Sequence, residues 1–147
     1  GGTMARMNIS GFGNVEKMLN QLKQPEKMAI RAVGEARPIV EKALKSQIRA
    51  VATRTDKNGK KYSTGGLAES IESTPVKKNN LGVYSVVKPE GENERGLRYV
   101  EEMAYLEYGV RSHGQEPRPV RAAAVAQSEN AVMQVMEEVI GAEVDKL

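Results

Sequence analysis

One apolar stripe constrains the fold of this chain more than any other feature. Seven apolar residues recur at spacings of 4, 3, 4, 4, 4 and 3: Ala29, Val33, Ala36, Val40, Leu44, Ile48 and Val51. This spacing places them on one side of a helix of about seven turns. Pro25 suits the first position of that helix. Pro38 lies inside it, where a proline removes one hydrogen bond, so we predict a kink near residues 34–38 rather than a break.

Short elements are expected before and after this long helix. Residues 7–12 have the pattern of a short extended segment, and Asn14 can cap a helix with an apolar side at Val15, Met18, Leu19 and Leu22. After the long helix, Thr64 can cap a short helix in which Leu67 and Ile71 are buried.

A hairpin and two further helices complete the predicted order. Residues 74–78 and 81–88 are typical of two strands joined at Asn79-Asn80, and Pro75 either places the first strand at an edge or confines its pairing to later residues. Residues 98–108 are predicted to be mostly helical. Pro119 can start a last helix, whose buried side is predicted at Val120, Ala124, Ala131, Val135, Val139 and Val144.

These elements predict a single α+β domain over residues 4–147, with two long helices packed on a small antiparallel sheet. Gly1–Thr3 precede Met4 and are interpreted as a cloning scar. The loops near residues 54–63 and 89–97 are polar and rich in charge, and we predict that both are mobile.

Composition narrows the possible functions. The 147 residues carry a net charge of +3 and include one histidine and no cysteine. Zinc sites normally need three or four His, Cys or carboxylate ligands, so a zinc centre is not expected. The sequence also lacks a phosphate-binding loop and an apolar run of the roughly 20 residues that a membrane span needs. We therefore predict no cofactor, no metal, no enzymatic activity and no membrane contact.

Unusual residues gather between residues 105 and 124. This stretch contains the only histidine, His113, together with Tyr105, Tyr108, Pro117 and Pro119. Ser112 adjoins His113, but neighbours in sequence do not generally point at one another, so a nucleophilic site is not supported. A loop stiffened by proline and flanked by tyrosines instead suits a protein contact, because it loses little entropy on binding.

A second candidate is the basic segment at residues 54–61. Arg54, Lys57, Lys60 and Lys61 lie in one loop, with Tyr62 as its only aromatic neighbour. This loop could contact a neighbouring subunit. It could also make sequence-independent contacts with phosphate groups, in which case the chain would be a small basic DNA-associated protein.

Two motifs resemble those of a known family. Residues 105–109 (YLEYG), a polar loop and then Pro117-Arg118-Pro119 before a last helix resemble the tail-component or neck (head–tail joining) proteins of long-tailed bacteriophages and prophages. The segment at residues 64–71 (TGGLAESI) is similar to that family's element ahead of a β-hairpin. Val110 and Val120 differ from the family pattern, which has threonine and an aromatic residue at these positions.

The resemblance implies a structural protein of the virion neck or tail, made in the bacterial host cytoplasm and assembled without catalysis. Its partners would be copies of itself in a ring, other neck proteins and the tail tube, with at most passing contact to DNA. The predicted assembly residues are Tyr105, Glu107, Tyr108, Gly109, Arg118 and Pro119. The loops near residues 54–61 and 90–96 carry opposite charges, which would fit pairing between adjacent subunits.

Overall fold

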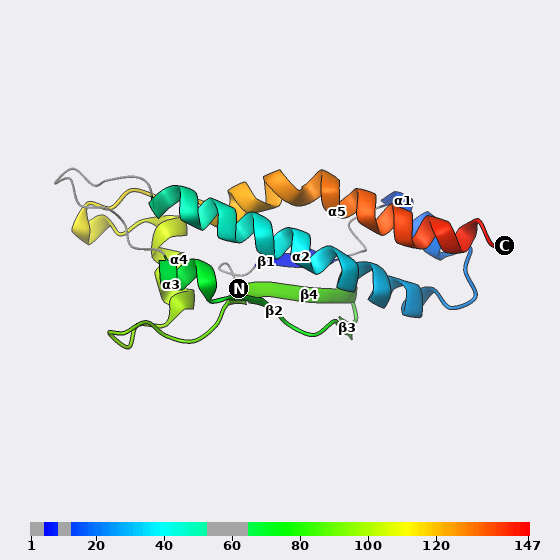
Figure 1. The fold of residues 1–147 in the computed structure, drawn as a ribbon, viewed down its shortest axis with the longest axis horizontal. Helices are drawn as coiled ribbons and strands as arrows, with labels where there is room; N and C mark the ends of the chain where they lie inside the picture. The colour runs from blue at the N-terminus through cyan, green and yellow to red at the C-terminus, as the bar shows by residue number, and fades with distance from the viewer. Residues whose placement is uncertain (1–4, 9–12, 53–64) are drawn as a thin grey trace.

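Helix α2 (Pro25–Ala52) is the longest element and lies at the centre of the fold (Figure 1). The computed structural model describes residues 5–8, 13–52 and 65–147. The remaining helices and strands of the described chain are β1 (Ala5–Asn8), α1 (Gly13–Leu19), α3 (Gly65–Glu69), β2 (Ile71–Ser73), β3 (Lys77–Asn79), β4 (Gly82–Pro89), α4 (Tyr99–Tyr108), the 3₁₀ turn η2 (Arg111–His113) and α5 (Val120–Val144).

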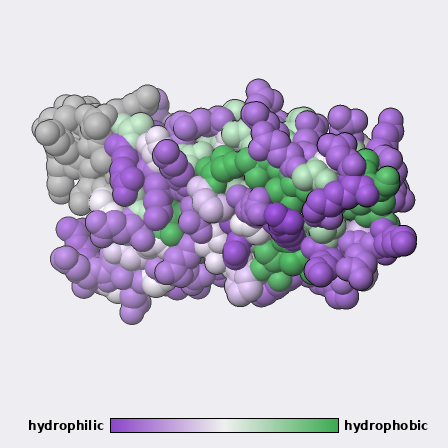
Figure 2. Space-filling view, turned by 45° about the vertical axis from the view of Figure 1, so that its right-hand side comes forward, coloured by the Kyte–Doolittle hydropathy of each residue, from purple (hydrophilic) through white to green (hydrophobic). Residues whose placement is uncertain are grey.

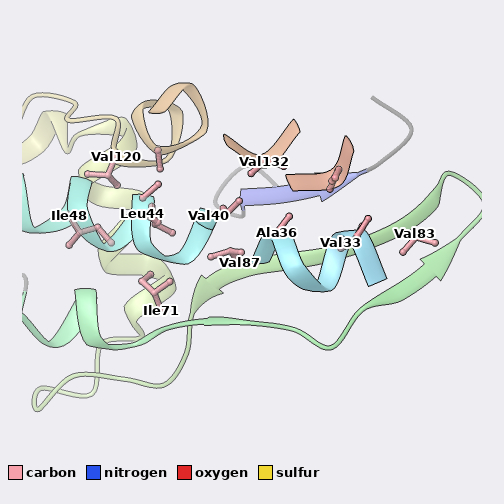
Figure 3. Close-up of a cluster of buried hydrophobic side chains, with 14 of the residues drawn as sticks. Val33, Ala36, Val40, Leu44, Ile48, Ile71, Val83, Val87, Val120 and Val132 are labelled. Carbon is pink, nitrogen blue, oxygen red and sulfur yellow. The ribbon is translucent and has the colours of Figure 1, made fainter. Parts of the chain in front are cut away.

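The predicted stripe on α2 is confirmed. All seven of its residues are buried, and several of them meet side chains of the sheet and of α5 in one apolar cluster (Figure 3). The helix continues through Pro38, as expected. Pro38 has no amide hydrogen to donate to the carbonyl of Gly34, four residues earlier. That carbonyl lies 3.5 Å from Nε of Arg37. The kink near residues 34–38 stays a prediction.

Helix α5 runs antiparallel to α2 and makes the most extensive helix–helix contact in the fold (Figure 1). Its buried face was predicted only in part. Val120, Ala124 and Val139 are buried as expected, but Ala131 is exposed, and Val135 and Val144 are only partly buried. The contact instead follows steps of four, with Ser128, Val132, Met136 and Ile140. Buried Ser128 donates its hydroxyl to the carbonyl of Ala124 at 2.8 Å, which removes the cost of burying it.

Strand β4 is the centre of an antiparallel sheet. It pairs with β1 on one side, and both β2 and β3 also pair with it. Its side chains alternate between partly exposed and buried, so one face of the sheet packs against α2. The α+β class is therefore confirmed, with one refinement. Helix α2 lies on the sheet, whereas α5 packs chiefly on α2.

The strand predicted at residues 74–78 is wrong in its first half, because β2 ends at Ser73, β3 begins at Lys77, and Pro75 lies between them. Strand β3 begins at Lys77, so pairing there is confined to the later residues as expected, and Ile71 is buried in β2 rather than in the short helix. Thr74 bridges the interruption. Its amide donates to the carbonyl of Val86 at 2.8 Å, and its hydroxyl accepts from the amide of the same residue at 2.9 Å. The ladder thus continues past the proline.

Two local predictions at the ends of elements have different outcomes. Helix α1 begins at Gly13, so Asn14 lies within the first turn and is not its cap; the Asn14 amide instead lies 3.4 Å from Glu137 on α5. Thr64 and the basic loop at 54–63 lie outside the described residues. The loop at 89–97 is described, and its mobility stays a prediction.

Candidate assembly surface

The predicted assembly residues meet at an elbow, which we define as residues 105–121, between α4 and α5. Gly109 ends α4 with φ of 74° and ψ of 176°, and its amide donates to the carbonyl of Tyr105 at 2.9 Å. A Cβ atom at this position would lie 2.6 Å from the carbonyl oxygen of Gln115 and 2.8 Å from the nitrogen of Pro117. The chain therefore turns sharply here because glycine permits both the dihedral angles and the close approach of the returning backbone.

Glu107 fixes the start of α5 from the neighbouring helix. Its side chain is buried, and its carboxylate oxygens accept hydrogen bonds from the backbone amides of Arg121, at 2.7 Å, and Ala122, at 3.3 Å. These are first-turn amides of α5, which have no partner within the helix, and Pro119 at the cap position supplies no side-chain oxygen. A negative charge at a helix N-terminus is also favoured by the helix dipole.

The remaining elbow residues close a compact loop. Val110 and Gln115 exchange two backbone hydrogen bonds, of 2.9 and 3.1 Å, around the η2 turn. The amide of Arg118 then donates to the carbonyl of Leu106 at 2.6 Å, which ties the end of the loop back to α4. His113 is exposed at the tip of this loop. Its amide donates to the carbonyl of Val110 at 3.1 Å, so it takes part in the loop through its backbone.

This bracing holds two tyrosines toward solvent. Tyr105 is 44% exposed and Tyr108 is 54% exposed, and they lie one turn apart on α4. The hydroxyl of Tyr108 lies 3.5 Å from a guanidinium nitrogen of Arg121. Val125 follows one turn further along α5 and is 48% exposed. We call Tyr105, Tyr108, Arg121 and Val125 the tyrosine surface. Tyr105 and Tyr108 were predicted as assembly residues, whereas Arg121 and Val125 were not.

The other predicted contact residues belong to the basic loop. Arg54, Lys57, Lys60 and Lys61 lie outside the described residues, so their relation to the elbow stays a prediction.

A glycine in the second family-like motif has a role that the sequence did not reveal. A Cβ atom on Gly66 in α3 would lie 2.5 Å from the hydroxyl of Tyr99, the first residue of α4. The absence of a side chain at Gly66 therefore lets the ring of Tyr99 lie close against α3. The tyrosine lies more than thirty residues away along the chain, and no local pattern connects the two.

A shallow groove between α2 and α5 is the other prominent surface feature. Its volume is about 690 Å³, and it is lined by both charged and apolar residues. Arg31 lies 3.8 Å from Glu143, and Lys146 lies 3.0 Å from the same carboxylate, so both basic side chains of the groove are paired within the chain. Figure 2 shows one face of the molecule, on which polar side chains dominate and apolar side chains gather near the middle and toward the right-hand end. The paired charges leave this groove less suited to a charged partner than the elbow.

Glu102, on the first turn of α4, differs from the solvated carboxylate that sequence alone would predict. Its Oε2 atom is buried and has no hydrogen-bond partner within the described residues. Burial raises the pKa of the Glu102 carboxyl above its ordinary value, and a side-chain hydrogen bond from Asn93 opposes part of that rise. Because the native pKa is raised, the native state favours the neutral acid, and stability falls as the pH rises through that pKa.

We therefore expect Glu102→Gln to stabilise the protein at neutral pH, where the ionised carboxylate is unfavourable. The gain should be below about 1 kcal/mol, because the group is only partly buried. It should vanish at about pH 3.5, where the acid is neutral in both states. Urea unfolding at both pH values measures this, with Glu94→Gln as an exposed control. A gain of equal size at both pH values would show that the carboxylate charge is not its cause.

The described part of the chain contains no cluster of three or more histidine or acidic side chains placed as metal ligands. No helix within residues 5–8, 13–52 and 65–147 combines the length and apolar character that crossing a bilayer requires. Comparisons with protein-family models, curated proteins and solved structures find no match to this chain.

Proposed function

We propose that this chain is a structural protein of a phage or prophage particle, which joins head to tail or completes the tail by assembling as a ring. The observation that carries the proposal is the braced elbow, which holds Tyr105 and Tyr108 exposed on a rigid joint between two helices. Tyrosine and arginine are enriched in the parts of interfaces that contribute most to binding. A surface that is already rigid loses little entropy when it binds.

The motif order supports the same assignment. Along the chain, the segment at residues 64–71 precedes the sheet, and the elbow precedes the last long helix. This is the order that the family resemblance implies. In this account the elbow acts by contact and not by chemistry. Its one buried carboxylate, Glu107, is occupied by two backbone amides. The role of the fold is to present an unchanging surface to the next subunit.

Sedimentation velocity at increasing protein concentration tests the proposal. A structural ring protein should move from monomer to a defined oligomer, and duplex DNA should not change its sedimentation at physiological salt. The alternative, a DNA-associated protein that uses the loop at 54–61, predicts binding to duplex DNA with a steep negative dependence on salt. Salt-sensitive DNA binding by a chain that remains monomeric would overturn the structural assignment in favour of that alternative.

A further inference from the structure

We propose that the tyrosine surface of one copy binds the loop at residues 90–97 of a second copy. The inference rests on the proposed function, because it states which two surfaces meet when the chain assembles. Four observations support it: the opposite charges of the two surfaces, the hydrogen bonds within each loop, the positions of the two surfaces at opposite ends of α4, and the exposed apolar side chains at the elbow.

The elbow is positively charged. Residues 105–121 include three arginines, Arg111, Arg118 and Arg121, against two carboxylates, buried Glu107 and exposed Glu116, for a net charge of +1. Arg111 is exposed on the η2 turn, and Arg121 contacts Tyr108 at the edge of the tyrosine surface. A partner with negative charge on a small, ordered loop would complement this arrangement.

The loop at residues 90–97 has the opposite charge. It contains three glutamates and Arg95, for a net charge of −2. Glu90 is paired with Lys88 at 3.3 Å, whereas Glu92 and Glu94 are exposed and carry no ion pair within the described residues. These two carboxylates are therefore available to arginines of another molecule.

The acidic loop is also held by hydrogen bonds within its own copy. The side-chain oxygen of Asn93 accepts from the amides of Arg95, at 2.9 Å, and Leu97, at 3.1 Å. The amide of Asn93 donates to the carbonyl of Leu97 at 2.8 Å, and that of Tyr99 donates to Gly91 at 2.9 Å. The loop closes on itself and docks on the start of α4, so little entropy would be lost when it meets the elbow.

The two surfaces lie at opposite ends of α4 (Figure 1). The helix has ten residues, which corresponds to about 15 Å at 1.5 Å per residue. The loop of one copy is thereby held away from the elbow of the same copy. A contact between two different surfaces is heterologous, and repeating it adds copies in one direction, which produces a ring when the rotation closes.

A second copy fits these observations better than nucleic acid. The elbow presents Tyr108 and Val125 as exposed apolar area next to its arginines, which suits a protein interface core. Binding of nucleic acid at the elbow would overturn the proposal.

A paired charge reversal tests the contact. Variant one carries Arg111→Glu with Arg121→Glu, and variant two carries Glu92→Lys with Glu94→Lys. Each variant alone would place like charges at every contact, so its self-association should weaken about tenfold or more at low salt. In an equimolar mixture every elbow would meet a loop of opposite charge, and association should return. Sedimentation velocity follows all three samples, and circular dichroism checks that each variant is folded.

Cysteine cross-linking provides a measurement that does not depend on charge. The chain has no native cysteine, so Arg111→Cys with Glu94→Cys introduces its only two thiols, and the proposed contact places position 111 of one copy beside position 94 of the next. Oxidation should give a ladder of covalent oligomers, since the pair joins different copies in succession. The single replacement Arg111→Cys is the matched control and should give no product larger than a dimer.

The outcomes separate this inference from the proposed function. If the native chain forms its oligomer but the charge variants do so equally well and no ladder forms, the elbow–loop contact is wrong and the ring assignment stands. If the native chain stays monomeric at every concentration, the ring assignment itself fails. If variant one loses DNA binding and keeps its self-association, the elbow is a nucleic-acid surface and the proposed contact is overturned.

Discussion

Replacing Gly109 by alanine is expected to lower the free energy of unfolding by about 3 kcal/mol or more. The backbone at Gly109 has φ of 74° and ψ of 176°, a region that side-chain-bearing residues rarely adopt. The added methyl group would also lie 2.6 Å from the carbonyl oxygen of Gln115, which is backbone and cannot move aside as a flexible side chain could. Both effects act where α4 turns toward α5.

Gly91→Ala is the matched control for Gly109→Ala. Gly91 also has a positive φ, of 84°, but a Cβ atom there would meet no atom within 4 Å. The control carries only the cost of a positive φ, about 1–2 kcal/mol, so the difference between the two variants reports the close approach at the elbow together with the ψ of 176° at Gly109. Urea unfolding followed by circular dichroism gives both values. Equal losses would show that the returning backbone does not constrain Gly109.

Replacing Glu107 by alanine is expected to cost about 2–3 kcal/mol. The variant removes the two acceptors that serve the amides of Arg121 and Ala122 and leaves those amides at the start of α5 without a side-chain partner. It also removes a negative charge from the helix N-terminus. Glu107→Gln keeps one carbonyl acceptor and should lose roughly half as much.

Glu116→Ala provides the control for Glu107→Ala. Glu116 lies in the same elbow but is exposed, so its replacement should change stability by less than about 0.5 kcal/mol. Amide hydrogen exchange adds a local measurement, because loss of the cap should speed exchange at residues 121 and 122 before the rest of α5. Unchanged exchange at these two amides would contradict the capping role.

Long helices and their contacts were the most predictable part of this fold. The stripe on α2 has seven members, so its phase is fixed by many residues at once. The helix was predicted to start at Pro25, and the stripe's last member, Val51, lies next to the observed end at Ala52. On α5 the apolar residues occur on more than one side, and Ser128 occupies a buried position. The hydroxyl of Ser128 donates to a carbonyl of its own helix. Because this polar residue interrupts the apolar pattern, the spacing of apolar residues alone did not show which face of α5 is buried.

The sheet and the elbow show where local patterns become insufficient. Pro75 was expected to limit pairing, yet the bridge through Thr74 depends on Val86, twelve positions away, and allowed β2 to form as a separate strand. Similarly, Glu107 was chosen as an elbow residue from its motif, but its partners on α5 are fixed only by the packing of two helices. A glutamate one turn after buried Met103 on the same helix face is the signal that points to a buried acceptor.

Exposed partners of the elbow could not be predicted from periodicity. Arg121 and Val125 join Tyr108 because the loop brings the start of α5 back across the end of α4. Their surface therefore depends on the conformation that Gly109 and Glu107 impose, and the same two residues link stability to assembly in this account.

Negative-stain electron microscopy of the purified chain, at a concentration where sedimentation shows association, tests the central claim most directly. The account predicts closed rings of uniform diameter with a central opening wide enough for a duplex, and the loss of these rings in Arg111→Glu with Arg121→Glu. A field of single small particles at all concentrations, or irregular aggregates without a closed form, would contradict it.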